Sequence, residues 1–273
     1  MKPNTVALIS VVMASAALGV QASPIAGQGT WESSLQYRDL DGNLGNGPEA
    51  FYDTVLNITW LRNANVNRGP NTTGQLDWSQ ALAWSSNLVV NGVSGWRLPT
   101  MVDTGAPGCD FSAIGGSDCG YNAATATSEL AHLFYVSLGN AARCVPGVAI
   151  CTPPPGGIGV VNSGAFLNLA RGAYTTGLEY APLTTERWTL DTDDGFQFIR
   201  PKNSLTYATV VRDGAIGTPM PFTFPDPVVV PVPQPQSYAM MIIGLGVLGA
   251  MVRRNQQRSA RCAASEAQRS SSP

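Results

Sequence analysis

The sequence predicts an α+β fold, a single domain with two helices packed on a mainly antiparallel sheet, between an N-terminal signal peptide and a C-terminal hydrophobic helix. Three observations lead to this class. Apolar residues recur with helical spacing in residues 78–90 and 128–138, whereas they alternate with polar residues near 52–61, 188–198 and 205–211. Strongly apolar segments lie close to both chain ends. The body between them, about 200 residues, is long enough for one domain with its own core.

Both expected helices have start signals. Asp77 can cap a helix near 78–90 while Gln80 reaches back to it, as in a capping box. Thr127 is placed to cap a second helix near 128–138. Each segment carries an apolar stripe, so we expect each helix to bury one face. The stripe of the second helix consists of Leu130, Leu133, Phe134 and Leu138.

The strands are expected on both sides of these helices. Alternation in residues 188–190 resumes at 196–198, and Asp194-Gly195 between them suits a tight turn, which together predict a hairpin. The pattern at 52–61 predicts one continuous strand, and that at 205–211 predicts a further one.

The N-terminus has the layout of an export signal. Lys2 precedes an apolar stretch from Val6 to Val20, and Val20-Gln21-Ala22 is a small-x-small site of the kind that signal peptidase cuts. We therefore expect residues 1–22 to be removed by cleavage after Ala22.

The C-terminus has a second apolar segment in a distinctive order. Pro233-Gln234-Pro235 is followed by an apolar run from Ala239 to Val252 and then by Arg253-Arg254. The run of 14 residues would span about 21 Å as a helix, short of the ~30 Å hydrocarbon core. A buried core helix is therefore an alternative. The all-apolar composition and the paired arginines favour a membrane segment that holds an exported body. Val228 to Gln236, rich in Pro and Val, predicts an extended linker before it.

The exported body is acidic. Between Ser23 and Pro235 there are ten basic and seventeen acidic residues, a net charge of −7. Nucleic-acid binding draws its affinity from clustered Lys and Arg, so a nucleic-acid partner is not expected.

Four cysteines lie in the body and Cys262 lies beyond the arginines. In an oxidising compartment, the short loops that the body cysteines close favour pairing Cys109 with Cys119 and Cys144 with Cys151. Four cysteines allow three connectivities, so the other two pairings stay open. A zinc site is disfavoured because the spacings are not those of a zinc knuckle and His132 is the only histidine.

Several strings in the body occur together in one bacterial domain family. They are YDTVLNITWL (52–61), WSQA (78–81), GWRLPT (95–100), GLEYAP (177–182) and YATVVR (207–212). In this order they resemble the family of the C-terminal domain of the Legionella collagen-like adhesin, a family without an assigned function, over residues 50–213. Thr175-Thr176 departs from the Trp-Ser that usually precedes the fourth string. The residues that carry the resemblance are Trp60, Trp78, Trp96, Arg97, Leu98, Pro99, Glu179, Tyr180, Trp188 and Arg212.

This resemblance implies a domain related to the C-type-lectin and formylglycine-generating-enzyme folds, although a fold by itself does not give a function. One member of the family is an adhesin that binds sulfated glycans. A body of net charge −7 does not offer the basic surface that such ligands need. A neutral polysaccharide or a protein partner therefore fits better.

The C-terminal segment resembles a PEP-CTERM sorting signal, the substrate of the membrane transpeptidase exosortase in Gram-negative bacteria that make exopolysaccharide. Gln234 stands where the family usually has Glu, and 19 residues follow Arg254 where such signals usually end sooner. An uncut, membrane-held tail is thus the alternative to processing. The predicted parts are a signal peptide (1–22), a lead-in (23–49), the adhesin-like domain (50–213), a Pro-rich linker (214–236), the sorting signal (233–254) and a basic disordered tail (255–273).

Candidate binding residues each have a structural alternative. Five tryptophans could stack on sugar rings, but a core role is favoured for most of them. Arg97 is expected to form a buried bidentate pair with an acid such as Asp53 or Glu179. Two acidic stretches are weak calcium candidates, although solvated turns are favoured for both. The tryptophans are Trp60, Trp78, Trp84, Trp96 and Trp188, and the stretches contain Asp191, Asp193 and Asp194, and Asp39, Asp41 and Asn43.

No catalytic motif or cofactor loop is present in the sequence, and we expect no cofactor. The expected partners are signal peptidase, exosortase, and an exopolysaccharide or a matrix protein, at the outer surface or in the extracellular matrix. We therefore predict an exported, non-catalytic binding module associated with exopolysaccharide or biofilm. A purely structural envelope component and a glycosidase with two carboxylates are the alternatives.

Overall fold

The computed structural model describes residues 22–66, 73–105, 115–148 and 150–221. These residues belong to one compact unit that ends at Pro221. The predicted sorting signal and its apolar helix lie outside them, as do Cys109 and Cys262. Among the described residues, no helix combines the length and the apolarity needed to cross a membrane.

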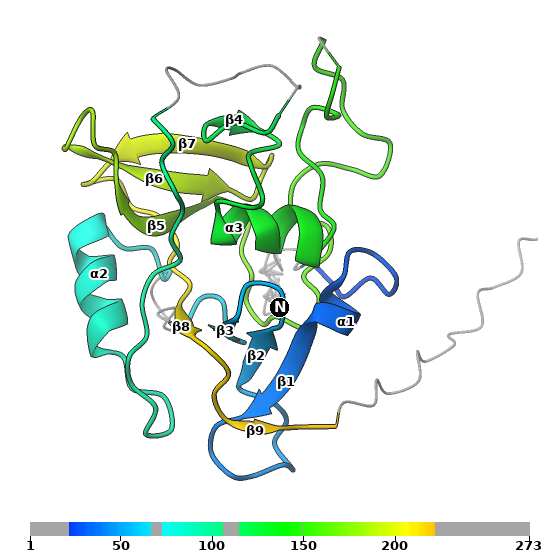
Figure 1. Ribbon diagram of the computed structural model, residues 1–273, viewed down its shortest axis with the longest axis vertical. Helices are drawn as coiled ribbons and strands as arrows, with labels where there is room; N and C mark the ends of the chain where they lie inside the picture. The colour runs from blue at the N-terminus through cyan, green and yellow to red at the C-terminus, as the bar shows by residue number, and fades with distance from the viewer. Residues whose placement is uncertain (1–21, 67–72, 106–114, 149, 222–273) are drawn as a thin grey trace, which may run out of the picture. The chain divides into compact units, whose positions relative to one another are not determined.

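Two antiparallel sheets form the framework (Figure 1). One has five strands in the order β8-β3-β2-β1-β9, and the other has four in the order β4-β7-β6-β5. The unit is therefore sheet-rich and of the α+β type, as the sequence predicts. The first sheet consists of β1 (Leu35–Asp39), β2 (Ala50–Asp53), β3 (Ile58–Leu61), β8 (Val211–Asp213) and β9 (Thr218–Pro219). The second consists of β4 (Gly120–Tyr121), β5 (Ala173–Glu179), β6 (Glu186–Asp191) and β7 (Phe196–Pro201).

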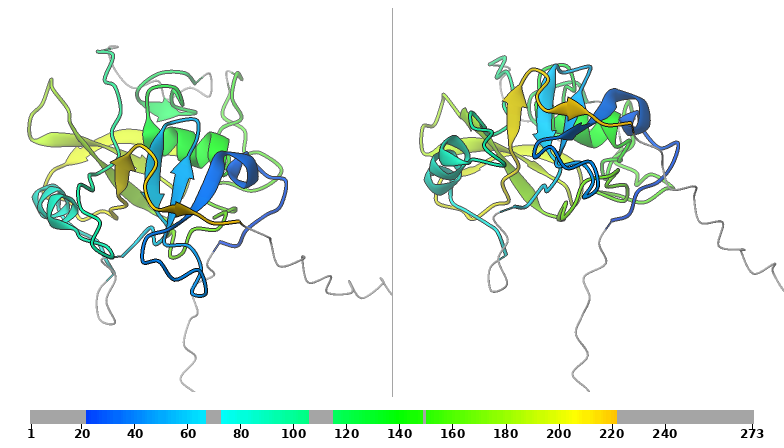
Figure 2. Two further views of the ribbon diagram at one scale, coloured as in Figure 1. Left: turned by 60° about the horizontal axis from the view of Figure 1, so that its bottom comes forward. Right: turned by 90° about the horizontal axis from the view of Figure 1, so that it is seen from below.

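The helices are short. They are α1 (Trp31–Ser34), α2 (Trp78–Asn87), α3 (Glu129–Ala131) and the π-helical turn η1 (His132–Ser137) that continues α3. The α3 segment lies between the two sheets, and the turned views keep it against β1 to β3 (Figure 2). Its apolar side chains join the largest hydrophobic cluster together with Phe51, Trp60, Tyr174 and Leu190. The main core therefore lies where both sheets meet this helix.

Both predicted helices are present, with one corrected cap. The Asp77 side chain accepts a hydrogen bond from the Gln80 N–H at 2.9 Å, and the Asp77 N–H donates to the Gln80 side chain. The predicted capping box is thus confirmed. At the second helix, however, Ser128 and not Thr127 provides the cap, because its hydroxyl accepts from the Ala131 N–H. Thr127 is one residue too early, and its hydroxyl bonds the Ala124 carbonyl.

The strand predictions had mixed outcomes. The 188–198 hairpin is confirmed: β6 and β7 pair antiparallel, and Gly195 in their turn has φ 73°. The strand predicted at 52–61 is wrong, since β2 and β3 form a hairpin there. Asn57 adopts φ 54° in its turn, and the Asp53 carboxylate accepts from the N–H groups of Val55 and Leu56. Asx turns of this kind end a strand within an otherwise strand-like sequence.

The strand predicted at 205–211 is also wrong. Thr206 and Tyr207 make isolated bridges, and only Val211 begins a strand, β8. Residues 208–211 are all buried, so they do not alternate between two environments. The segment instead makes single bridges to Leu76 and to Tyr174 of β5 before it enters β8, and its apparent period of two does not reflect a sheet face.

Residues outside the range 50–213 also belong to the unit. Trp31 of α1 is 1% exposed in the main core, and β1 is an interior strand of the five-stranded sheet, between β2 and β9. At the other end, β9 pairs with β1, with Arg38 opposite Pro219. The folded unit is thus built from sequence on both sides of the motif-bearing region.

Candidate functional site

The tryptophans separate into two groups. The first group contains five tryptophans that pack within hydrophobic clusters. Four of these are buried, and the fifth, Trp84, is partly buried. Trp78 is half-buried and belongs to none of these clusters. The core role favoured for most tryptophans is therefore confirmed, and Trp78 is the exception. The buried four are Trp31, Trp60, Trp96 and Trp188.

The Trp78 ring is held in place by polar contacts. Its Nε1–H donates to the carbonyl of Thr176 at 3.0 Å, and its backbone N–H donates to the carbonyl of Lys202 at 2.9 Å. The Lys202 ammonium lies 4.3 Å from the ring centroid, a cation–π contact. As the first residue of α2, Trp78 is also positioned by the Asp77 cap. The ring therefore has a defined orientation.

A charged pair lies beside this ring. Lys202 forms an ion pair with Glu179, at the end of β5, and both side chains are partly exposed. We call Trp78, Glu179 and Lys202 the Trp78 site. The site combines an aromatic ring, a hydrogen-bond donor and an acceptor with no net charge, features that suit the apolar face and the hydroxyl groups of a sugar.

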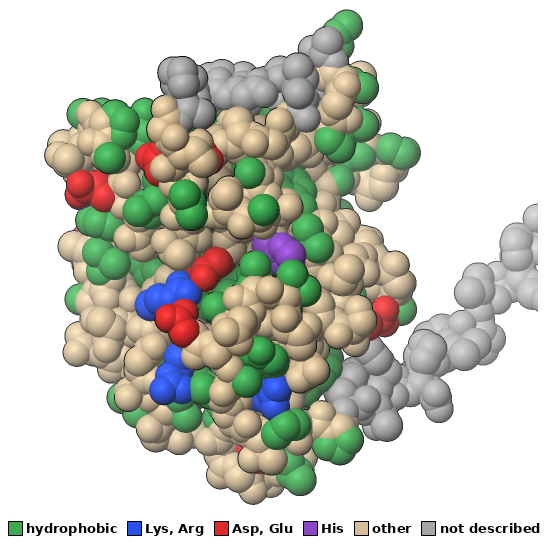
Figure 3. All heavy atoms as spheres, viewed as in Figure 1, with side chains coloured by type: hydrophobic (Ala, Val, Ile, Leu, Met, Phe, Trp, Pro, Cys, Tyr) green, Lys and Arg blue, Asp and Glu red, His purple; other side chains and the backbone are tan. Residues whose placement is uncertain are grey.

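Trp78 and Glu179 are both among the residues on which the predicted family resemblance rests, but Lys202 is not. Nothing in the sequence near Lys202 indicates a binding role, because the β6–β7 hairpin and the chain following it place it over the ring. Elsewhere, charged side chains are few and of mixed sign on the face shown in Figure 3. A basic surface is therefore not displayed there.

Arg97 of the WRLPT string forms a bidentate pair as predicted, but with another acid, and the pair is only partly buried because the Arg97 side chain is 34% exposed. Its guanidinium donates to both carboxylate oxygens of Glu129, at 2.9 and 2.8 Å, and to Asp213 at 2.6 Å. Asp53 and Glu179, the predicted partners, have other roles, in the β2–β3 turn and in the Trp78 site. The hydrogen bonds that Arg97 donates to the Glu129 carboxylate raise the pKa of Arg97 further above its ordinary value. Arg97 thus ties β8 to the start of α3.

Most of the other motif residues build the framework. Trp60, Trp96, Leu98 and Trp188 are buried. The Pro99 carbonyl accepts the Gly177 N–H at 2.8 Å, which joins the WRLPT string to the GLEYAP string. The Tyr180 ring packs edge-on against Trp188, with centroids 5.3 Å apart. Arg212 lies on β8 opposite Thr59. The motif is therefore mainly structural.

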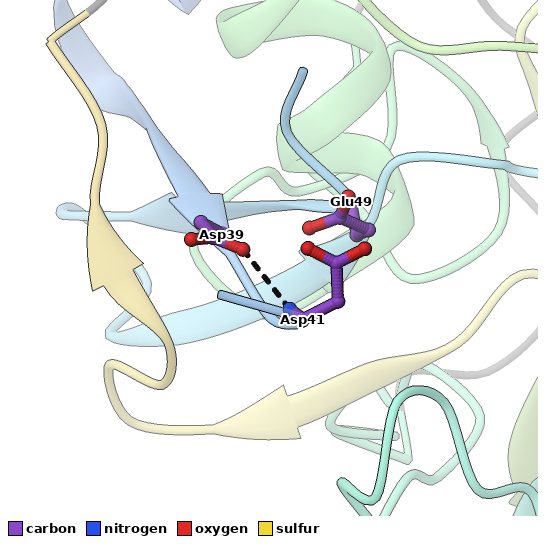
Figure 4. Close-up of side chains that lie close together, drawn as sticks. All are labelled: Asp39, Asp41 and Glu49. Carbon is purple, nitrogen blue, oxygen red and sulfur yellow. Dashed lines mark hydrogen bonds between the residues drawn. The ribbon is translucent and has the colours of Figure 1, made fainter. Parts of the chain in front are cut away.

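Three acidic residues lie close together, and two of them, Asp39 and Asp41, belong to a stretch that the sequence analysis named as a calcium candidate. Ligand atoms of Asp39, Asp41 and Glu49 lie within 4.8 Å of one another (Figure 4). Glu49 immediately precedes β2 and was not predicted. Three carboxylates can hold a divalent cation. Here each of them already accepts an N–H hydrogen bond, and the bond from Asn46 lowers the pKa of Asp41. The three carboxylates therefore serve as hydrogen-bond acceptors that stabilise the local turns.

The other calcium candidates point to separate partners. Asp191 pairs with Arg200, and Asp193 pairs with Arg171. Asp194 accepts from the Tyr121 hydroxyl and from the Phe196 N–H. The three carboxylates thus bind different groups of the protein and do not converge on one point.

A cavity of about 480 Å³ lies beneath the loop that Cys144 and Cys151 close. The predicted Cys144–Cys151 disulfide is present. Cys119 is also disulfide-bonded, and its predicted partner Cys109 lies outside the described residues. The polar side chains of the cavity bond within the protein: Tyr135 donates to the Gly195 carbonyl, and Asn122 donates to the Cys144 carbonyl. The remaining wall is mainly Ala, Val and Pro.

The comparison with family models concerns the C-terminal segment. Residues 231–255 match the PEP-CTERM protein-sorting motif. The chain is an exported protein that exosortase sorts, directed to the cell surface and membrane-anchored at its C-terminus before cleavage. The predicted sorting residues Pro233, Gln234, Pro235, Arg253 and Arg254 all fall within the match. No curated protein and no solved structure matches the chain.

Proposed function

We propose that this exported protein is a non-catalytic module that binds a neutral saccharide of an exopolysaccharide matrix through the Trp78 site. The observation that carries the proposal is that Trp78 belongs to none of the hydrophobic clusters that the described residues form. The ligand would contact the part of this half-buried ring that the Lys202 ammonium leaves open to solvent.

The chemistry of the neighbours favours sugar hydroxyl groups. The Lys202 ammonium can donate to a hydroxyl oxygen, and the Glu179 carboxylate can accept from a hydroxyl hydrogen. The two charges cancel within the site, and the body has a net charge of −7. A polyanionic glycan would be repelled by this body, so the proposed ligand is neutral.

Two considerations support binding without catalysis. The Glu179 carboxylate is already engaged by the Lys202 ammonium, which competes with any role in proton transfer to a substrate. Asp77, adjacent to Trp78 along the chain, is committed to the helix cap, and the Gln80 N–H that it binds lowers its pKa. The resemblance to the adhesin family, and through it to the C-type-lectin fold, belongs to the same proposal.

The proposal can be tested with residues 23–230, which contain the described unit, on arrays of neutral and acidic polysaccharides. Saturable binding to a neutral polymer is expected. Trp78→Ala should weaken it at least tenfold, on the order of 1.4 kcal/mol. Leu183→Ala, which removes an exposed side chain from the neighbouring turn, is the matched control and should bind normally.

Three results would overturn the proposal. Absence of binding by a folded protein to any matrix polymer would favour the purely structural alternative. Release of reducing ends from the polymer would favour a glycosidase. Equal loss of binding in both variants would move the site away from Trp78.

A further inference from the structure

The cavity beneath the disulfide loop is enclosed by two parts of the chain. One part consists of the segment between β4 and α3 together with η1 and the residues that follow it, and the other is the disulfide loop with the prolines after it. Ala123 and Ala142 are buried at its floor, whereas Pro146 and Pro155 are exposed at its rim. Its volume of about 480 Å³ lies in the range of small-molecule sites.

Most polar side chains of the cavity wall are already bonded within the protein. The Asn140 Oδ1 accepts the Asn162 N–H at 2.9 Å, and the Asn140 Nδ2 donates to the Asn162 carbonyl at 2.9 Å. The Tyr135 hydroxyl accepts the Asn122 N–H at 3.0 Å and donates to the Gly195 carbonyl. Among the described residues that line the cavity, none is charged. A ligand with a charge or many hydroxyl groups would therefore lose its bonds to water without gaining partners here.

The apolar walls favour a ligand of the same character. A water molecule in a protein cavity needs about two to four hydrogen-bond partners, and walls made mainly of Ala, Val and Pro offer few. Replacing weakly held water by an apolar group is favourable, and the removal of apolar surface from water adds to the gain. The affinity of such a site would come from burial and not from hydrogen bonds.

The rim of the cavity is held in place by two connections. Cys144 and Cys151, seven positions apart, are joined by the disulfide. Next to it, the Val145 N–H donates to the Thr152 carbonyl at 3.0 Å. The two chain arms that carry the rim prolines are thereby linked, and each proline has a fixed φ. Little conformational entropy therefore remains to be lost when a ligand binds.

We propose that this cavity is a binding site for a small, uncharged and mainly apolar molecule, and that the Cys144–Cys151 disulfide keeps the site preformed. The ligand class differs from that of the Trp78 site, which offers partners to sugar hydroxyl groups. The two sites are independent, so that Trp78→Ala should leave binding at the cavity unchanged.

The test is photolabelling of the full chain in detergent micelles with benzophenone, an uncharged apolar probe that couples to nearby C–H groups under ultraviolet light. Mass spectrometry of the digested protein locates the label. The apolar run 239–252 is the internal reference, because the C-terminus is the membrane-anchored part of the chain. Relative to it, labelling within residues 122–155 should saturate with probe concentration. The charged analogue 4-benzoylbenzoate should label the cavity at least about tenfold less.

Two variants fill the cavity from different parts of its wall. Thr125→Trp and Val145→Trp each introduce a large ring, and each should reduce the saturable labelling at least about tenfold. Ala126→Trp and Val148→Trp are the matched controls. They add the same ring at neighbouring exposed positions that do not line the cavity, and their labelling should equal that of the wild type.

Replacing both Cys144 and Cys151 by Ala should also reduce the labelling, because the disulfide then no longer links the two arms of the rim. Near-ultraviolet circular dichroism checks that each variant is folded. Labelling of the cavity that does not saturate, or that is equal in the filled and the control variants, would overturn the proposal. Unchanged labelling in the cysteine variant would overturn the role assigned to the disulfide.

Discussion

The guanidinium of Arg187 donates a hydrogen bond from Nε to the Thr175 hydroxyl at 3.1 Å, and both side chains are fully buried between β5 and β6. Its remaining partners are also uncharged oxygens. They are the carbonyls of Arg200, Pro201 and Ser204 and the hydroxyl of Thr206. Burial lowers the pKa of Arg187 to about 10. One buried cation therefore holds β5, β7 and the segment after it together.

Replacing Arg187 should lower the stability of the fold. Arg187→Lys keeps the charge but loses the planar fork, which leaves several buried oxygens without a donor. We expect the free energy of unfolding to fall by roughly 2–4 kcal/mol, measured by urea denaturation. Arg171→Ala, which removes an exposed ion pair with Asp193, is the control and should cost less than about 1 kcal/mol. A similar loss in both variants would contradict a structural role for Arg187.

The Arg97 pair should show the difference between a partly buried and an exposed acid. Glu129→Gln should destabilise the unit by about 1–3 kcal/mol, because Glu129 also accepts the Thr100 N–H at 2.7 Å. Asp213, whose side chain is 78% exposed, should matter little, and Asp213→Asn should cost within about 0.5 kcal/mol. Thermal unfolding of the two variants at equal salt checks this order. The reverse order would show that Arg97 depends on β8 and not on α3.

Asp194 gives a pH-dependent prediction. Its burial and the nearby Asp191 raise the pKa of Asp194 in the folded state above the unfolded value. The stability associated with this group is complete below the unfolded pKa and is lost as pH rises through the folded pKa. Asp194→Asn, which can still accept the Phe196 N–H, should therefore raise Tm at pH 7. The gain should vanish near pH 3. If calcium instead raised the Tm of the wild-type protein but not that of the variant, and a chelator removed the difference, Asp194 would belong to a cation site.

Buried tyrosines predict the alkaline limit of the fold. Burial raises the pKa of Tyr37 to about 12 and also raises those of Tyr135 and Tyr174. For a raised folded-state pKa, the stability is full below the unfolded value of 10 and is lost as pH rises toward 12. We expect the tyrosinate absorbance of these residues to appear together with the loss of circular dichroism. Gradual ionisation of every tyrosine in a folded protein would contradict their burial.

Features encoded within a few residues were predicted from the sequence. The Asp77–Gln80 capping box, the turn at Asp194-Gly195 and the Cys144–Cys151 loop each depend on groups that local chain geometry brings together. The PEP-CTERM motif is a contiguous string and was found in the same way. The single strand at 52–61 failed because alternation continued through a turn that depended on Asn57 and Asp53.

The sequence by itself determined the C-terminal sorting motif, the fold class and local features such as the Asp77 cap and the Asp194-Gly195 turn, because each is carried by neighbouring residues. The tertiary structure decided which acid pairs with Arg97, 32 residues away at Glu129 and 116 away at Asp213. It also decided that Lys202 covers Trp78 and that the other tryptophans enter the core. Such pairings depend on how the two sheets and α3 pack, and many remote partners are compatible with the same local pattern.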